Sequence, residues 1–295
     1  MSRATVATGM ELEYDTFGDP ADPALLLVMG LGAQMILWDN RFCQLLADTG
    51  RYVIRFDNRD CGLSTKFDGV EVDMNAMIMA MLSGDASALA GKTPYQLSHM
   101  AADAAALLDH LNIARAHIAG ASMGGMIVQT MAIEHPDRVA SLTSIMSQTG
   151  EPAYGHADPA AQAVLMRPPA ADRDGHIASS VDAEVIMSKK YRDHDQIRAR
   201  AAESYDRSFY PQGTARQLAA IVASGSRADG LRQLNVPTVV IHGLDDTLIN
   251  PTGGRRTAEL IPGAVLVELE DMGHDLPEPL WPLIIEAMSK ASAGG

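Results

Sequence analysis

Three residue types that together perform nucleophilic catalysis occur in the order serine, aspartate, histidine: Ser122, then Asp245 or Asp246, then His274. A serine hydroxyl is a poor nucleophile at neutral pH, so it needs a base within hydrogen-bond reach and a carboxylate that orients the base. We therefore expect Ser122 to be the nucleophile and His274 its base. Asp246 is the preferred acid, and its neighbour Asp245 stays the alternative.

Ser122 lies in the pattern GASMG (residues 120–124), between two segments of different type. Residues 117–119 are typical of the end of a buried strand, and residues 125–134 carry apolar side chains at helical spacing. A turn this sharp strains its central residue and needs small residues two before and two after it. The pattern predicts that the Ser122 hydroxyl stands clear of the sheet and that the Met123 amide, at a helix start, stabilises an oxyanion.

A second oxyanion donor is expected in the loop that follows the apolar run ALLLVM (residues 24–29). The loop begins Gly30, Leu31, Gly32 and resembles a dinucleotide-binding loop. The third glycine of that motif would fall at Met35, so no such site is predicted. The Leu31 amide is the candidate donor, and an ordinary strand-to-helix turn is the alternative.

Asp246 and His274 each come just after a predicted strand in the last third of the chain. Because the carboxyl ends of parallel strands lie at one edge of a sheet, both should meet the serine there. Asp271 and Asp275 flank the histidine and could serve as the acid only if their loop doubled back.

Apolar runs alternate with helical patterns along most of the chain, which predicts a mostly parallel sheet with helices on both faces. The expected strands are a hairpin over 3–16 and the segments 24–29, 51–56, 117–119, 139–145, 236–243 and 264–270, and the expected helices include 38–48, Thr93–Leu111 with Thr93 as the N-cap, 125–134, 252–260 and one from Pro279 onward. After strand 51–56 comes the polar loop DNRDCGLS, whose charges are expected to fix its geometry.

Residues 148–228 interrupt this alternation with helix-like pieces and no β-run. We expect them to form a helical cap over a core made of residues 1–147 and 229–295. A methionine-rich insertion near residues 70–92 is typical of an adaptable apolar pocket or lid. Its Met77 and Met81 are candidates for substrate binding, with ordinary core packing as the alternative.

Composition narrows the possible partners. The formal charge of −14 disfavours nucleic acid and anionic membranes, which both reward basic patches. No secretory signal or membrane span is visible, so the cytosol is the expected compartment.

Cys43 and Cys61 are expected to be buried and free. Gly91, Lys92 and Thr93 end like a phosphate loop that lacks its first glycine, and the histidines of 148–228 are dispersed, so no cofactor or metal is predicted.

Several motifs together resemble the α/β-hydrolase superfamily over nearly the whole chain: GASMGG, MGLG, DNRDCGLS, HGLDD and MGH. The acid of that family stands three residues after the glycine of HGxxD, which selects Asp246, and its oxyanion donors correspond to Leu31 and Met123. The segments DPALLLVMG and RYVIRFDNRDCGLST look more closely like bacterial carboxylesterases and lipase-like hydrolases near the aclacinomycin methylesterases. Family members often carry HG where this chain has Met29 and Gly30.

The resemblance implies an eight-stranded α/β-hydrolase sheet and a serine hydrolase without a cofactor. The expected reaction is hydrolysis of small-molecule carboxylic esters that are neutral and fairly apolar. A lactonase or a polyketide methyl esterase is the nearest alternative, and the triad permits all three. A cofactor-free perhydrolase and a non-catalytic ligand-binding protein of the same fold also stay open.

Overall fold

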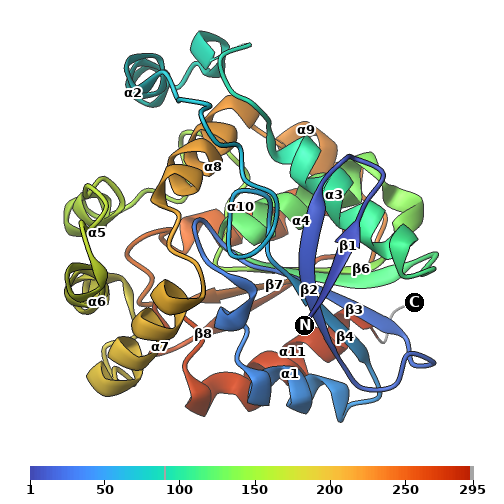
Figure 1. Ribbon diagram of the computed structural model, residues 1–295. Helices are drawn as coiled ribbons and strands as arrows, with labels where there is room; N and C mark the ends of the chain where they lie inside the picture. The colour runs from blue at the N-terminus through green and yellow to red at the C-terminus, as the bar shows by residue number, and fades with distance from the viewer. Residues whose placement is uncertain (90, 293–295) are drawn as a thin grey trace.

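An eight-stranded β-sheet forms the centre of the molecule (Figure 1). The computed structural model describes residues 1–89 and 91–292, so residue 90 of the expected insertion and residues 293–295 of the expected core lie outside it. In chain order the strands are β1 (Ser2–Thr5), β2 (Glu11–Phe17), β3 (Ala24–Val28), β4 (Tyr52–Phe56), β5 (Ala116–Ala121), β6 (Val139–Ile145), β7 (Thr238–Gly243) and β8 (Val265–Leu269).

The strands lie side by side in the order β1-β2-β4-β3-β5-β6-β7-β8. β1 and β2 form the predicted antiparallel hairpin at one edge, and β2 is antiparallel to β4. Every other neighbouring pair is parallel. The predicted mostly parallel sheet is therefore confirmed, and the carboxyl ends of its parallel strands share one edge.

Helices cover both faces of this sheet. The α-helices are α1 (Asn40–Ala47), α2 (Met74–Ser83), α3 (Leu97–His110), α4 (Met123–Glu134), α5 (Pro159–Leu165), α6 (Arg173–Asp182), α7 (His194–Arg207), α8 (Pro211–Ser224), α9 (Ala228–Leu231), α10 (Thr252–Leu260) and α11 (Trp281–Ser292); short 3₁₀ turns are η1 (Met35–Leu37), η2 (Ala86–Leu89), η3 (Pro136–Arg138), η4 (Ala183–Ile186) and η5 (Glu278–Leu280). Figure 1 shows α3, α4 and α10 on one face and α1 and α11 on the other.

The two faces of the sheet form two apolar clusters, because successive side chains of a strand point to opposite sides. In β3, Leu26 and Val28 pack with α3 and α4, whereas Leu25 and Leu27 pack with α1 and α11. All five residues of β3 are buried. The central strand that leads to the Gly30 loop is thus fixed on both sides.

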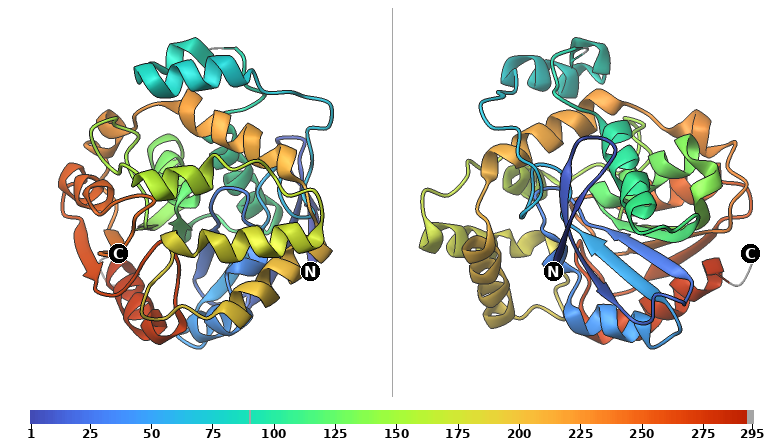
Figure 2. Two further views of the ribbon diagram at one scale, coloured as in Figure 1. Left: turned by 90° about the vertical axis from the view of Figure 1, so that its left-hand side faces the viewer. Right: turned by 45° about the vertical axis from the view of Figure 1, so that its right-hand side comes forward.

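Helices α5 to α8 lie between β6 and β7 in the chain, and no strand occurs between residues 146 and 237. Figure 2 shows these helices together on one side of the sheet. We call residues 148–228 the cap segment; the domain boundaries at 147/148 and 228/229 stay a prediction. None of the helices in the described part of the chain combines the length and apolar character needed to cross a bilayer.

The helix expected from Thr93 begins later, at Leu97, and the prediction of Thr93 as its N-cap is wrong. Tyr95 is buried and its hydroxyl donates to Asp60 Oδ2 at 2.7 Å. Gln96 takes the N-cap position, and its N–H donates to His99 Nδ1 at 3.1 Å. A tertiary contact therefore outweighs the local capping preference of the Thr-Pro pair.

Candidate active site

Ser122 occupies the sharp turn between β5 and α4. Its backbone has φ 57° and ψ −121°, a sparsely populated conformation of the kind that costs about 1–3 kcal/mol. A Cβ at Gly120 would lie 2.1 Å from Gly124 O, and a Cβ at Gly124 would lie 2.0 Å from Val28 O, so only glycine fits at either position. The Ser122 N–H donates to Ile145 O at 2.9 Å, which ties the turn to the neighbouring strand. The strained turn expected from the sequence is present.

The structure brings the side chains of Ser122, His274 and Asp246 together. Ser122 Oγ lies 2.9 Å from His274 Nε2, and His274 Nδ1 lies 2.8 Å from Asp246 Oδ2. An ionised carboxylate can only accept, so Nδ1 carries the proton and the lone pair of Nε2 faces the serine hydroxyl. Asp246 follows β7 and His274 follows β8, as predicted. In this arrangement the imidazole can take the serine proton.

The Asp246 carboxylate is buried and hydrogen-bonded through both oxygens. Oδ1 accepts from the N–H groups of Leu248 and Ile249, each at 2.9 Å, and Oδ2 lies 3.4 Å from His242 Nε2 as well as facing His274. Burial by itself raises the pKa of this carboxyl. The positive charge of His274 and hydrogen bonds from both histidines outweigh burial and hold the pKa below its ordinary value. The Asp246 carboxyl is therefore ionised, and an ionised carboxylate is what stabilises a neighbouring imidazolium.

The other aspartates that the sequence left open have different partners. Asp275 Oδ1 accepts from Ser188 Oγ at 2.5 Å, and Asp271 Oδ2 lies 2.5 Å from Lys190 Nζ. Asp245 is half-buried, and its N–H donates to the carbonyl of residue 272. Within the described residues, none of these three side chains is hydrogen-bonded to the triad histidine.

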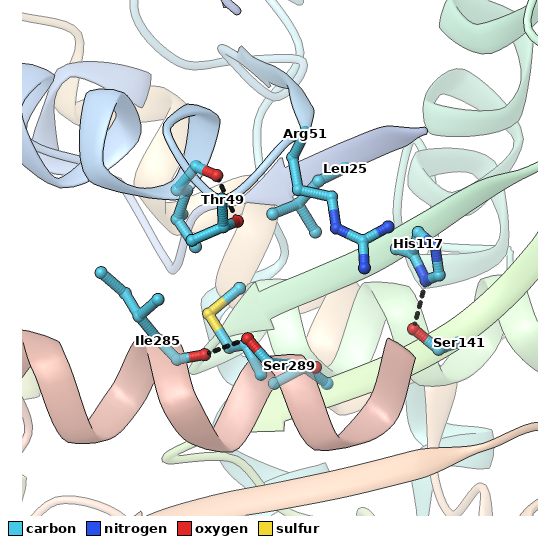
Figure 3. Close-up of a pocket in the computed structure, with 10 residues that line it drawn as sticks. Leu25, Thr49, Arg51, His117, Ser141, Ile285 and Ser289 are labelled. Atoms are coloured by element: carbon cyan, nitrogen blue, oxygen red, sulfur yellow. Dashed lines mark hydrogen bonds between the residues drawn. The ribbon is translucent and has the colours of Figure 1, made fainter. Parts of the chain in front are cut away.

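His117 lies on β5 and belongs to another part of the molecule. It lines a cavity of about 20 Å³ between the sheet and helices α1 and α11, and no triad residue lines that cavity (Figure 3). Its Nδ1 lies 2.8 Å from Ser141 Oγ. Burial, together with the positive charges of Arg51 and Arg115, lowers the pKa of His117 to about 4. This ring is uncharged at neutral pH and is not the base for the serine.

The loop after β3 lies directly against Ser122. A Cβ built on Gly30 would be 3.1 Å from Ser122 Cβ and 3.6 Å from its Oγ. In the described part of the chain, neither the Leu31 N–H nor the Met123 N–H donates to a protein acceptor. Amides without a protein acceptor are what an oxyanion hole requires, and the assignment of Leu31 and Met123 as its donors stays a prediction.

Two side chains that the sequence reasoning did not identify brace this loop. Asn58 Nδ2 donates to Met29 O at 3.0 Å. Gln217, buried on α8, accepts from the Gly32 N–H at 2.8 Å and donates to Arg59 O at 2.8 Å. They support the loop at Met29 and Gly32, on either side of Gly30. Asn58 could have been suspected from the sequence because it lies in the polar loop DNRDCGLS. Nothing in the sequence of α8 distinguishes Gln217 from its neighbours.

Charged residues of the DNRDCGLS loop form ion pairs with the surrounding helices. These pairs agree with the expectation that the charges fix the geometry of the loop. Three buried ion pairs do this: Asp57 with Arg207 (2.7 Å), Asp60 with Arg216 (2.8 Å) and Arg59 with Asp103 (2.6 Å). Two of these pairs join the core to the cap segment. Cys43 and Cys61 are both buried and free, as predicted.

The methionine-rich insertion forms α2, which lies at the outer edge of the molecule beyond α8 (Figure 1). Met77 is buried in a small apolar cluster with Ala219 of α8. Met81 is 36% exposed. Packing against α8 accounts for Met77, and a role of either methionine in substrate binding stays a prediction.

Comparisons with known proteins agree with this architecture. The family model described as alpha/beta hydrolase fold matches residues 23–278. A rhodomycin D methylesterase from Streptomyces sp. (strain C5) is 28% identical, with 89% of this chain and 90% of that protein covered. A 3-oxoadipate enol-lactonase 2 from Acinetobacter baylyi is 26% identical over 90% of this chain and 86% of that protein.

The solved structures that resemble this chain share its fold. The enol-lactonase from Burkholderia xenovorans LB400 superimposes with a TM-score of 0.74 over 99% of this chain and 100% of that chain, at 22% identity. A thermophilic esterase from Thermogutta terrifontis gives a TM-score of 0.72 at 23% identity, with 99% and 100% of the two chains covered.

Proposed function

We propose that this chain, which belongs to the alpha/beta hydrolase fold family, is a serine hydrolase that cleaves carboxylic esters of neutral, fairly apolar small molecules. One observation carries the proposal: Ser122 Oγ, His274 and Asp246 are connected by hydrogen bonds of 2.9 and 2.8 Å at a strained strand-to-helix turn. Relatives named as a methylesterase and as an enol-lactonase support ester chemistry.

In the proposed mechanism His274 takes the Ser122 proton while the serine oxygen attacks the ester carbonyl carbon. The resulting oxyanion accepts hydrogen bonds from the Leu31 and Met123 amides, and Asp246 stays ionised beside the imidazolium. His274 then gives the proton to the leaving alcohol. A water molecule, deprotonated by the same histidine, attacks the acyl-enzyme. The bond from the acyl carbon to Ser122 Oγ then breaks, the histidine returns the proton to the serine oxygen, and the acid leaves.

The charge of the protein bears on which esters it takes. The net charge of −14 gives no general attraction to anionic substrates. A neutral ester is neither attracted nor repelled by this negative charge. The length of the acyl group and the identity of the alcohol depend on side chains of the cap segment.

A lactonase is the second candidate, because the enol-lactonase relative aligns over most of both chains. A lactone is an intramolecular ester, so the same nucleophile and oxyanion donors serve its opening. The two functions differ in where the leaving oxygen goes, since in a lactone it stays attached to the acyl group.

The test combines active-site labelling with a substrate panel. A fluorophosphonate probe should label the wild-type protein at Ser122, as peptide mass spectrometry would show, and should not label Ser122→Ala. Nitrophenyl esters from acetate to palmitate, with a few lactones, then compare kcat/KM between the two candidates. Loss of Ser122 should lower kcat by roughly 10⁴- to 10⁶-fold.

Two results would overturn parts of this proposal. Wild-type protein that does not react with the probe at Ser122 would instead be a ligand-binding protein of this fold. A clear preference for lactones over open esters of the same acyl length would assign the second candidate.

A further inference from the structure

Besides the core hydrogen bonds from Asp245 N–H to Met272 O and from Trp281 Nε1 to Leu276 O, a short stretch of the cap segment holds the loop that carries His274. The contacts are His274 N–H to Ile186 O (2.6 Å), Ser188 N–H and Oγ to Asp275 Oδ1 (3.0 and 2.5 Å), Gly273 N–H to Ser188 Oγ (2.9 Å), and Lys190 Nζ to Asp271 Oδ2 (2.5 Å). The cap residues in these contacts are Ile186, which ends η4, and Ser188 and Lys190, which follow it.

Ser188 stands at the centre of this contact. Its residue is 0% exposed, and its hydroxyl donates to Asp275 and accepts from Gly273, the two neighbours of His274. A Cβ on Gly273 would lie 2.5 Å from the Ser188 nitrogen and 2.5 Å from the Met187 carbonyl carbon. The two backbones are therefore in direct contact, with no side chain between them.

The base depends on this contact more than the acid does. The loop from 270 to 277 contains no helix or strand, so backbone ladders do not fix it. By contrast, the Asp246 carboxylate itself accepts from the N–H groups of Leu248 and Ile249 in its own loop. That loop is also tied to the cap segment, because Thr247 Oγ1 donates to Val185 O at 3.0 Å, but this bond lies outside residues 186–190. The His274 ring must keep its hydrogen bonds to Ser122 and to Asp246 at the same time. The acceptor of its backbone N–H, Ile186 O, lies in the cap segment.

We propose that Ser188 of the cap segment is a positioning residue for His274, which it holds in line with Ser122 by clamping Gly273 and Asp275. This inference rests on the proposed serine hydrolase function. It assigns the cap segment a second role beside covering the substrate. Residues 186–190 and His274 then move together. A change that weakens the contacts of residues 186–190 lowers the rate of proton transfer from Ser122 to His274.

The primary test is Ser188→Ala, with Ser224→Ala as the matched control. Ser224 is also a cap serine whose hydroxyl accepts from a core amide, Leu97 N–H at 2.9 Å, and donates to Ala220 O at 2.7 Å. It does not contact the loop of the base. We expect Ser188→Ala to lower kcat by roughly 10- to 100-fold, the loss typical of a small misplacement of a catalytic group, with little change in KM. Ser224→Ala should keep the wild-type kcat.

A readout on the imidazole separates positioning from a loss of stability. The proton between His274 Nδ1 and Asp246 should give a low-field resonance in the proton NMR spectrum. We expect it to shift or broaden in Ser188→Ala and to stay in place in Ser224→Ala. A melting temperature measured for each variant identifies any that simply unfolds.

A double-mutant cycle provides a second route that does not depend on one substitution. Asp275→Ala removes the other partner of the Ser188 hydroxyl, so the two single losses should not add in the double variant. Full additivity in kcat, or an unchanged kcat and an unchanged low-field resonance in folded Ser188→Ala, would overturn the proposal.

Failure of this inference differs from failure of the proposed function. If the wild type does not react with a fluorophosphonate at Ser122, the function itself is wrong. If the wild type reacts and folded Ser188→Ala reacts at the same rate, only the positioning role is wrong.

Discussion

Replacing the triad acid by its amide, Asp246→Asn, tests the tautomer on which the mechanism depends. In the wild type Oδ1 accepts two backbone N–H groups, from Leu248 and Ile249, and Oδ2 faces His274 Nδ1. An asparagine must keep its oxygen on the two N–H groups, because its NH₂ group cannot accept from them. The NH₂ group then points at Nδ1 of the histidine.

This orientation forces the wrong tautomer. An NH₂ group facing Nδ1 favours the imidazole that carries its proton on Nε2, and such a ring cannot accept the proton of Ser122. The volume and the backbone hydrogen bonds of the side chain are nearly unchanged. We expect kcat to fall by roughly 10⁴-fold, about 5.5 kcal/mol of barrier at 25 °C.

Asp245→Asn is the matched control, because it makes the same chemical change one residue away at a half-buried side chain. The assay is kcat and KM on a nitrophenyl ester at pH 7, with the rate of fluorophosphonate labelling as a measure of nucleophile activation. Loss of less than 10-fold in Asp246→Asn, or an equal loss in Asp245→Asn, would refute the assignment of the acid and the tautomer argument.

Two further predictions concern buried charges. Arg216→Met should lower the free energy of unfolding by about 3–5 kcal/mol, because it leaves the buried Asp60 carboxylate without its cation. In urea denaturation Arg173→Met, which breaks the exposed pair with Asp206, should lose much less, and equal losses would contradict the prediction. The pKa of His117 is lowered from 6.5 to about 4, so the unfolded chain binds more protons between these values and stability should fall as pH drops from about 6.5 to about 4. After allowance for the partial exposure of the ring we expect a loss of about 1–2 kcal/mol, and urea titrations of His117→Gln across this range should lack it.

The parts of the site that could be predicted from the sequence are those whose geometry is local. Gly120 is required by sterics inside the turn itself, whereas Gly124 is required because Val28 O of β3 lies close to it. Both glycines still belong to one short pattern around Ser122, so the pattern indicates the turn. The strands before Asp246 and His274 are visible as apolar runs, and parallel strands bring their carboxyl ends to one edge. Order along the chain then identified which side chains could meet.

The parts that escaped prediction depend on contacts between distant segments. Gln217 reaches Gly32 across 185 residues, and Ser188 reaches Asp275 across 87. Neither residue belongs to a local pattern, because a buried hydrogen bond leaves no periodicity in the sequence. The late start of α3 has the same origin, since the contact of Tyr95 with Asp60 spans 35 residues.

These long-range contacts divide the support of the site between two parts of the chain. The nucleophile is fixed by its own strained turn and by Ile145 of the next strand, all within the sheet. The loop after β3 and the loop that carries His274 are each hydrogen-bonded to the cap segment, through Gln217 and Ser188 respectively. A hydroxyl without aligned donors or an aligned base is a weak nucleophile. It follows that exchanging the cap segment for that of a relative changes kcat as well as substrate preference, unless the buried hydrogen bonds made by these two side chains are kept.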